Sequence, residues 1–224
     1  MDVEEKFPAQ EYSKAKKAQW LGIECKRVLD IGCGYGPYVD NFLKWGADYI
    51  VGIDQNTKMI EMCKSKFTGH PKLEFHVQSA IDMSYCEEFE LVTAVMTLSN
   101  VWKALKSGGE FIAIVPHGNP DIDFTEEAGK KFGAYMKLTS HPPPDGCRAK
   151  TIFYDTKQEQ IIGEANSTFF YKETYEKSLR KAGFLKIAWK EPHIDPKYIE
   201  KYGEDFFRCF RNPARELILH ALKN

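Results

Sequence analysis

The segment Val28–Gly36, VLDIGCGYG, joins an acidic residue to a glycine-rich turn and carries the strongest chemical signal in the chain. An apolar run ends in Asp30, and glycines alternate with other residues from Gly32 to Gly36. Glycines let a backbone approach a ligand closely, and a helix that starts after them presents exposed N–H donors. In the dinucleotide pattern G-x-G-x-x-G no acid precedes the turn, and the third glycine comes one residue later, where Pro37 stands. Asp30 would repel a pyrophosphate and attract an ammonium group, so the turn favours a nucleoside that carries an amino acid.

A second acid, Asp54, ends the apolar run Val51–Asp54, VGID, one predicted strand later. A carboxylate at this place can accept hydrogen bonds from both hydroxyls of a ribose. The position after the glycine turn favours that role over the alternatives of a turn residue or a helix cap. Met59 follows one turn into the next predicted helix, where it either packs on an adenine ring or belongs to the core.

Strand-sized and helix-sized segments alternate through the first half of the sequence. Strands are predicted at 26–31, 49–53, 73–77, 91–96 and 111–115. Helices are predicted between them at 37–45, from Thr57 as the N-cap to 68–69, and at 100–106, where Ser107-Gly108-Gly109 ends the helix. This alternation predicts an α/β fold, a Rossmann-like, doubly wound and mostly parallel sheet.

The pattern changes after Pro116. Residues 117–144 are irregular with a helix near 126–136, and 150–154 and 160–170 alternate as two antiparallel strands. A helix (172–182), a strand (184–190), an aromatic-rich helix (196–210) and a last, antiparallel strand (216–222) follow. We expect a single domain over 1–224. Its parts are an N-terminal arm (1–25), a cofactor-binding half (26–116), a small cap insertion that rises over the sheet (117–171), and C-terminal helices and strands (172–224).

Composition excludes several classes of protein. With 43% hydrophobic and 28% charged residues, the 224-residue chain has the composition of a globular protein. A net charge of -1 without a basic stripe predicts no nucleic-acid partner. Apolar runs fall short of the ~20 residues that span a bilayer, and MDVEEKFPAQ holds no apolar signal core, so we expect no membrane partner and a cytoplasmic location. Six cysteines without a C-x-x-C pair predict free thiols, and no cysteine–histidine spacing predicts a metal.

These motifs resemble those of class I S-adenosylmethionine-dependent methyltransferases. The likeness covers about residues 26–116: VLDIGCGYG, then VGID, then FELVTAV followed by LKSGGEF. It implies S-adenosyl-L-methionine as the cofactor and methyl transfer, which we expect to go to a small-molecule acceptor. The resemblance implies these cofactor contacts: Asp30, Gly32, Cys33, Gly34 and Gly36 along the methionine part, Asp54 and Gln55 at the ribose, Ser79, Ala80 and Ile81 beside the adenine, and Val95 and Met96 near the transferred methyl.

The remainder of the chain resembles a narrower group, the toxoflavin-biosynthesis type of small-molecule methyltransferase. The likeness rests on FYKETYE at 170–176, AGF at 182–184 and YGEDFF at 202–207. Tyr12, Lys16 and Trp20 match the spacing Y-x-x-x-K-x-x-x-W of an arm that, by the resemblance, closes over the cofactor. The alternative is that this arm only packs on the sheet.

Three departures from such proteins keep other functions open. The segment between Trp20 and the first strand is short, as is the connection Thr97–Ser99 after the fourth, and Ser79 stands where an acid is usual. A degenerate, non-catalytic S-adenosylmethionine-binding protein is therefore one alternative. A protein or nucleic-acid methyltransferase is the other, although the near-zero charge and MTLS at 96–99, in place of N/D-P-P-Y, disfavour it.

Methyl transfer from a sulfonium is an in-line displacement, in which a protein chiefly aligns the two reactants. A base is needed only when the acceptor must lose a proton. His117, His141 and His193 are candidates for it, and the sequence assigns none. We expect the cap to determine acceptor choice. Its aromatic residues suit a flat acceptor, or equally a plain core: Phe153, Tyr154, Phe169, Phe170 and Tyr171.

Overall fold

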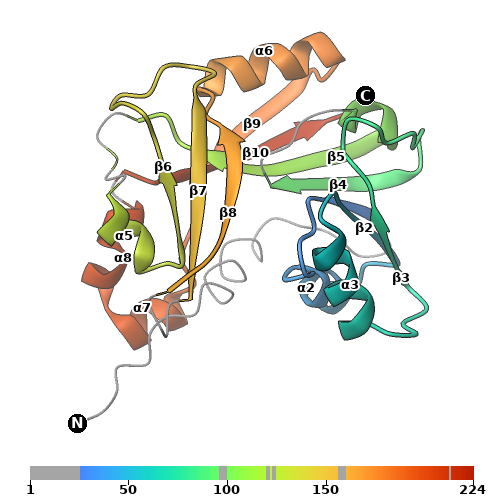
Figure 1. Ribbon diagram of the computed structural model, residues 1–224. Coiled ribbons are helices and arrows are strands. Elements are labelled where there is room, and N and C mark those ends of the chain that lie inside the picture. Colours follow the sequence, from blue (N-terminus) through green and yellow to red (C-terminus); the bar gives the residue numbers. More distant parts are fainter. Residues whose placement is uncertain (1–25, 96–99, 120–121, 123–124, 156–159, 212) are drawn as a thin grey trace. The chain divides into compact units, whose positions relative to one another are not determined.

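The computed structural model describes residues 26–95, 100–119, 122, 125–155, 160–211 and 213–224 (Figure 1). Tyr12, Lys16, Trp20 and Met96 lie outside these residues. The chain divides into two compact units. Among the described residues, the sheet unit contains 26–115, 176–190 and 218–224. The insertion unit is formed by described residues within 116–175 and 191–217, so the segment predicted as a cap shares it with a later stretch of the chain.

In the described part of the chain, a seven-stranded sheet has the order β3-β2-β1-β4-β5-β10-β9 (Figure 1). Its strands are β1 (Arg27–Ile31), β2 (Tyr49–Asp54), β3 (Leu73–Val77), β4 (Phe89–Val95), β5 (Leu105–Pro116), β9 (Lys186–Lys190) and β10 (Glu216–Leu222). The strands β1 to β5 pair in parallel, whereas β10 runs antiparallel to β9. The predicted Rossmann-like, mostly parallel sheet with an antiparallel C-terminal strand is confirmed.

Helices and aromatic side chains cover both faces of this sheet. The helices are α2 (Val39–Lys44), α3 (Thr57–Lys66), α4 (Val101–Ala104) and α6 (Lys172–Ala182). On one face, Phe42 of α2 and Ile60 of α3 share a buried cluster with Ile112 of β5. The next residue of β5, Phe111, points to the other face because side chains alternate along a strand. There its ring lies 6.2 Å from that of Phe184, so apolar residues on both faces of β5 build the core.

The segment Ser107-Gly108-Gly109 does not end a helix, and that prediction was wrong. The helix α4 is already complete at Ala104, and β5 begins at Leu105. Gly108 has a φ of +73° at the place where the pairing of β4 with β5 shifts register. Its amide donates to the carbonyl of Lys223, 2.9 Å away. The glycines therefore form an irregularity inside β5. It lies where this strand is hydrogen-bonded to Lys223, near the C-terminal end of the chain.

Helix α3 begins one residue earlier than predicted. Asn56, and not Thr57, is its N-cap, and the Asn56 side chain accepts a hydrogen bond from the amide of Lys58 at 3.0 Å. Asparagine is a strong N-cap because its side-chain oxygen satisfies an amide that has no partner within the helix. The cap fixes the chain directly after Asp54, at the end of β2.

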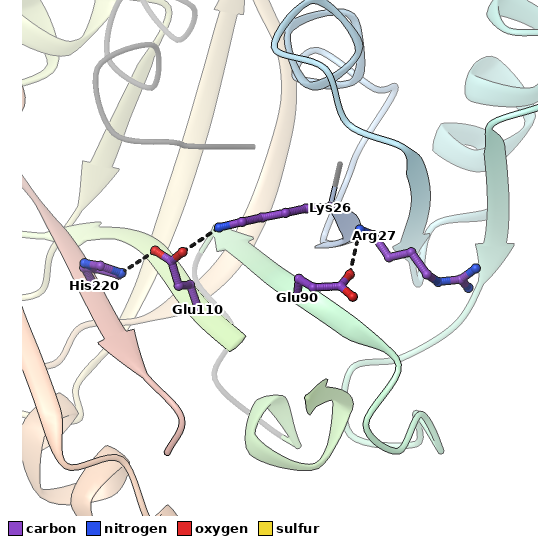
Figure 2. A network of polar contacts seen from close by, with 5 residues as sticks. All are labelled: Lys26, Arg27, Glu90, Glu110 and His220. Atoms are coloured by element: carbon purple, nitrogen blue, oxygen red, sulfur yellow. Dashed lines mark hydrogen bonds and ion pairs between the residues drawn. The ribbon is translucent and has the colours of Figure 1, made fainter. Parts of the chain in front are cut away.

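Charged residues connect the strands at the amino edge of the sheet (Figure 2). The carboxylate of Glu110 lies between Lys26 Nζ, at 2.5 Å, and His220 Nε2, at 2.8 Å. Beside it, Glu90 accepts from the Arg27 amide at 2.8 Å and also pairs with the Lys106 ammonium group. These contacts join β1, β4, β5 and β10, which are far apart in the sequence.

The insertion unit contains a three-stranded antiparallel sheet in the order β6-β7-β8. Its strands are β6 (Ala134–Lys137), β7 (Arg148–Asp155) and β8 (Gln160–Thr168), so the predicted antiparallel pair is confirmed. The helix expected near 126–136 is shorter. The observed helix is α5 (Glu126–Lys130), and Gly133, with a φ of +84°, leads from it into β6.

The aromatic-rich segment 196–210 forms two helices where one was predicted. Gly203, with a φ of +82°, separates α7 (Pro196–Tyr202) from α8 (Glu204–Arg211). Two rings of α8 pack on Phe132, with centroids 5.4 Å away for Phe206 and 6.1 Å for Phe207. The break lets the aromatic residues of both helices gather in one cluster of the insertion unit. No helix within the described residues is long and apolar enough to cross a bilayer.

Candidate functional site

The glycine turn follows β1 and is fastened to the end of β2. The amides of Gly32 and Cys33 both donate to the carbonyl of Ile53, at 2.8 and 3.0 Å. Gly32, Gly34 and Gly36 have φ values of +69°, +56° and +78°. Residues that carry a side chain rarely adopt this left-handed backbone conformation, so the turn requires glycine at these positions. The turn lies at the carboxyl edge of the parallel strands, where open α/β sheets bind ligands.

Two of these glycines have opposite surroundings. A Cβ added to Gly36 would come within 2.9 Å of the Phe67 ring and 3.2 Å of Cys63 Sγ, so Gly36 is needed for packing against α3. Among the described residues, a Cβ added to Gly34 would meet nothing within 4 Å. The backbone of Gly34 is therefore not covered by any described side chain.

Asp30 is buried beneath the turn, with 1% of its surface exposed. Thr93 of β4 donates its hydroxyl to Asp30 Oδ1 at 2.6 Å, and the two residues are partners in the β1–β4 register. A buried carboxylate is stabilised by such donors. Thr93 thus holds one oxygen of the Asp30 side chain in place behind the turn.

Asp54 connects the turn to the start of α3. Its Oδ2 accepts from the Gly34 amide at 3.0 Å, and its Oδ1 accepts from the Asn56 amide at 2.8 Å. A carboxylate has about four lone-pair sites, so two hydrogen bonds leave acceptor capacity for a diol. No cation forms an ion pair with Asp54 among the described residues. Gln55 beside it is exposed.

The segment Ser79–Ile81 is tied to the same edge. The amide of Gln78 donates to the carbonyl of Asp54 at 3.0 Å, and Ser79 Oγ accepts from the Ile81 amide at 3.3 Å. Ala80 is buried, whereas the apolar side chain of Ile81 is 69% exposed. A turn held in this way presents backbone groups and an uncovered apolar side chain beside Asp54.

Cys33 belongs to the buried core cluster on one face of the sheet, whereas Met59 does not. Cys33 is buried, and a hydrogen bond with Cys63, burial and the nearby carboxylates of Asp30 and Asp54 raise the pKa of its thiol. Such a thiol stays protonated at neutral pH and is no nucleophile. Met59 is half-buried on α3.

Other predicted residues contribute less to the described geometry. Val95 ends β4 and pairs with Ile114 of β5. The ring of His117 is held in place by the backbone, since its Nδ1 lies 2.9 Å from the carbonyl oxygen of Ala214. No group of three or more His, Cys, Asp or Glu residues that could hold a metal ion occurs within the described ranges.

Three residues of the site were missed by the sequence analysis. Thr93 supports Asp30, Asn56 supports Asp54, and the side chain of Asn100 donates to the carbonyl of Ile81 at 2.6 Å. Asn56 had a local signal, since an asparagine before a helical segment is a typical N-cap. Thr93 and Asn100 act on residues that lie 63 and 19 positions away in the chain, and no local pattern reveals such contacts.

Comparisons with known proteins agree with this geometry. Residues 28–109 match the family model described as a methyltransferase domain. A ubiquinone biosynthesis O-methyltransferase from Aromatoleum aromaticum is 34% identical over 83 residues, which are 36% of this chain and 35% of that protein. A tRNA U34 carboxymethyltransferase from Stutzerimonas stutzeri is 48% identical over 42 residues, 19% of this chain and 13% of that protein. The chain therefore matches about a third or less of these relatives' length.

Among solved structures, an S-adenosylmethionine-dependent methyltransferase from Mesorhizobium loti matches with a TM-score of 0.66 and 15% identity, covering 96% of this chain and 98% of that one. The fold is therefore that of the class I, Rossmann-like methyltransferases. Within it, the matched family model covers the glycine turn, Asp54 and the segment 79–81.

Proposed function

We propose that this protein is an S-adenosylmethionine-dependent methyltransferase that acts on a small molecule. The observation that carries the proposal is the position of the Asp54 carboxylate, bound to the Gly34 amide beside an open glycine turn. Such a group accepts from the two hydroxyls of a ribose, while the turn admits the neighbouring part of the ligand to the backbone. The match to the methyltransferase domain over residues 28–109 supports the same cofactor.

The described residues are suited to hold the ribose, the adenine and the amino-acid part of this cofactor. Asp54 and Gln55 would hold the ribose, and Ser79, Ala80 and Ile81 would border the adenine. Asp30 would attract the ammonium group across the backbone of the turn, where Gly32 and Gly34 allow close approach. When bound, S-adenosylmethionine supplies a methyl group on a sulfonium that is already activated. What remains for the chain is to orient the donor and to exclude water.

The acceptor part of the proposal has separate support. The net charge of -1 offers no basic surface for a nucleic acid. The relatives that match parts of this chain act, by name, on chemically different acceptors, so we infer that the likeness to them does not determine the acceptor. We assign acceptor choice to the insertion unit, in which Phe153 of β7 keeps 40% of its surface exposed. Phe169, in contrast, is fully buried with Met136 and Ala149 and serves the core.

The experiment is a transfer assay with methyl-labelled S-adenosylmethionine. The full chain is incubated with labelled donor and, in parallel, with a metabolite extract, with bulk tRNA and with a protein extract. We expect label in the metabolite fraction. Label in tRNA or protein would overturn the small-molecule acceptor. Binding of the donor without label in any fraction would identify a non-catalytic cofactor-binding protein.

A paired substitution tests the role of the insertion unit. Phe153→Ala should lower acceptor turnover by about a hundredfold if the ring contacts the acceptor, since aromatic truncation at a contact costs several kcal/mol, and should leave cofactor affinity within a few-fold. Leu185→Ala is the control, because Leu185 is 64% exposed in the sheet unit and its loss should change neither quantity. Equal losses of turnover and cofactor affinity in Phe153→Ala would contradict this division of roles.

A further inference from the structure

Asn100 stands at the start of α4 in an unusual backbone conformation. Its φ is +58°, and Glu87, at +52°, is the other residue besides glycines with positive φ in the described ranges. Asparagine is one of the few residue types that tolerate the left-handed region. A non-glycine residue in this conformation has a physical cause, because the left-handed region costs energy and persists only where the surrounding structure requires it.

The side chain of Asn100 does not serve the helix that follows it. Asn100 is the N-cap residue of α4, yet its side chain makes no capping hydrogen bond. Nδ2 instead lies 2.6 Å from the carbonyl of Ile81 and 3.4 Å from that of Ala80. Both partners can only accept, so the group that faces them is the NH2. The amide thus spans two consecutive peptides of a segment about twenty residues earlier in the chain.

Asn100 completes the attachment of this segment. Its start is tied to β2 through the bond from Gln78 to Asp54, and its middle is closed by the Ser79 hydroxyl on the Ile81 amide. The carbonyl of Ser79 accepts from the Asp82 amide at 3.1 Å, and Asn100 donates to the two carbonyls that follow, those of Ala80 and Ile81. Ile81 itself contributes little, because its side chain is 69% exposed. The short bond of Asn100, at 2.6 Å, fixes the peptide that follows Ile81, while the peptide between Ala80 and Ile81 is held by Asn100 on its carbonyl and by Ser79 Oγ on its amide.

We propose that Asn100 is a positioning residue for recognition of the adenine base. By holding the carbonyls of Ala80 and Ile81, it sets how the backbone of this turn faces the Watson–Crick edge of the base, and it holds Ile81 where an apolar side chain can cover the ring. Base selectivity at this site depends on a residue that does not touch the base. The inference rests on the proposed function, since it requires an adenosine-containing cofactor at Asp54.

Two variants separate the side-chain amide from the backbone conformation. Asn100→Gly keeps the left-handed conformation without strain and removes the amide. Asn100→Asp keeps the shape and replaces the two donors by an anionic acceptor, which faces two carbonyl oxygens. Glu87→Gly is the matched control, because Glu87 is the other left-handed residue in the same unit and its described hydrogen bonds go to Lys103 and Lys223.

The readout is the ratio of two affinities measured by calorimetry on the full chain, for S-adenosylhomocysteine and for S-inosylhomocysteine, which carries an oxo group in place of the adenine amino group. We expect the wild type and Glu87→Gly to prefer the adenine compound equally. Asn100→Gly should lower that preference about fivefold, the size of one or two neutral hydrogen bonds, and Asn100→Asp should lower it further. Thermal melting of each variant confirms folding.

Each outcome decides between the two claims. If the wild type binds neither compound, the proposed function fails and the inference fails with it. If the wild type binds both equally, no base recognition exists at this edge and the inference alone is overturned. If both Asn100 variants melt earlier but keep the wild-type preference, Asn100 has only a structural role. A variant that does not fold leaves the decision to the other, since Asn100→Gly relieves strain where Asn100→Asp adds repulsion.

Discussion

At the carboxyl edge of the sheet, Asp54 accepts from two backbone amides and Asp30 from a threonine hydroxyl, whereas at the amino edge Glu110 lies between Lys26 and His220 (Figure 2). Neutral donors orient a carboxylate and leave its charge in place. A cationic partner such as Lys26 neutralises the carboxylate, and contacts from two sides join strands. The comparison indicates that the amino edge stabilises the fold, while at the carboxyl edge Asp54 keeps acceptor capacity, which under the proposed function serves the hydroxyl groups of a ribose.

Removing one carboxylate from each edge gives the largest expected contrast. Asp54→Ala should weaken binding of S-adenosylhomocysteine at least tenfold, because it removes two charge-assisted hydrogen bonds worth about 1.5–3 kcal/mol each. Glu110→Ala should leave this affinity within twofold and lower the free energy of unfolding by about 1–3 kcal/mol. Calorimetry and urea denaturation of both variants measure the two effects. A folded Asp54→Ala variant with wild-type affinity would reduce Asp54 to a turn residue.

Two glycines of the sheet unit sharpen the comparison further. Gly34 and Gly69 have φ values of +56° and +71°, and an added Cβ would meet nothing within 4 Å at either position. Substitution by alanine should therefore lower the free energy of unfolding equally at the two positions, by roughly 1–2 kcal/mol, because alanine is strained in the left-handed conformation. Only Gly34→Ala should also lower the affinity for the cofactor, by about tenfold, because its methyl group enters the space that a ligand needs. Equal affinities of the two variants would show that no ligand approaches Gly34.

The smallest expected effect concerns pH. The hydrogen bond from His220, together with Lys26, lowers the pKa of Glu110 from 4.5 to about 2 in the folded chain. A carboxylate with a depressed pKa stabilises the fold above the unfolded value, and this contribution is lost as pH falls from 4.5 towards 2. The wild type should lose stability across this window more steeply than Glu110→Gln, in melting curves recorded at several pH values. Parallel curves for the two proteins would mean that the pairing of Glu110 adds nothing.

The sequence predicted the sheet unit well because local signals coincide with its elements. The runs that became β3, α6 and β10 have the predicted limits or nearly so, and each is bounded by residues with clear turn or cap chemistry. The error at 107–109 has a physical cause. Glycines usually end elements, but here strand pairing with the C-terminal end of the chain, through Lys223, carries the strand through them.

The insertion unit was harder to predict for a related reason. Residues 134–137 have no strand signal of their own and form β6 because β7 offers them an open edge. Within the site, the glycine turn and Asp54 were visible as motifs, whereas Thr93 and Asn100 became visible only through contacts made by folding. Their roles depend on which strands lie side by side, and a single sequence does not state that.

The most direct test of the account is a calorimetric titration of the full chain with S-adenosylhomocysteine and, separately, with NAD. The arrangement of Asp30, Asp54 and the open glycine turn predicts binding of S-adenosylhomocysteine with a dissociation constant in the micromolar range and no binding of NAD, whose pyrophosphate would face Asp30. Binding of NAD without any response to S-adenosylhomocysteine would contradict the account.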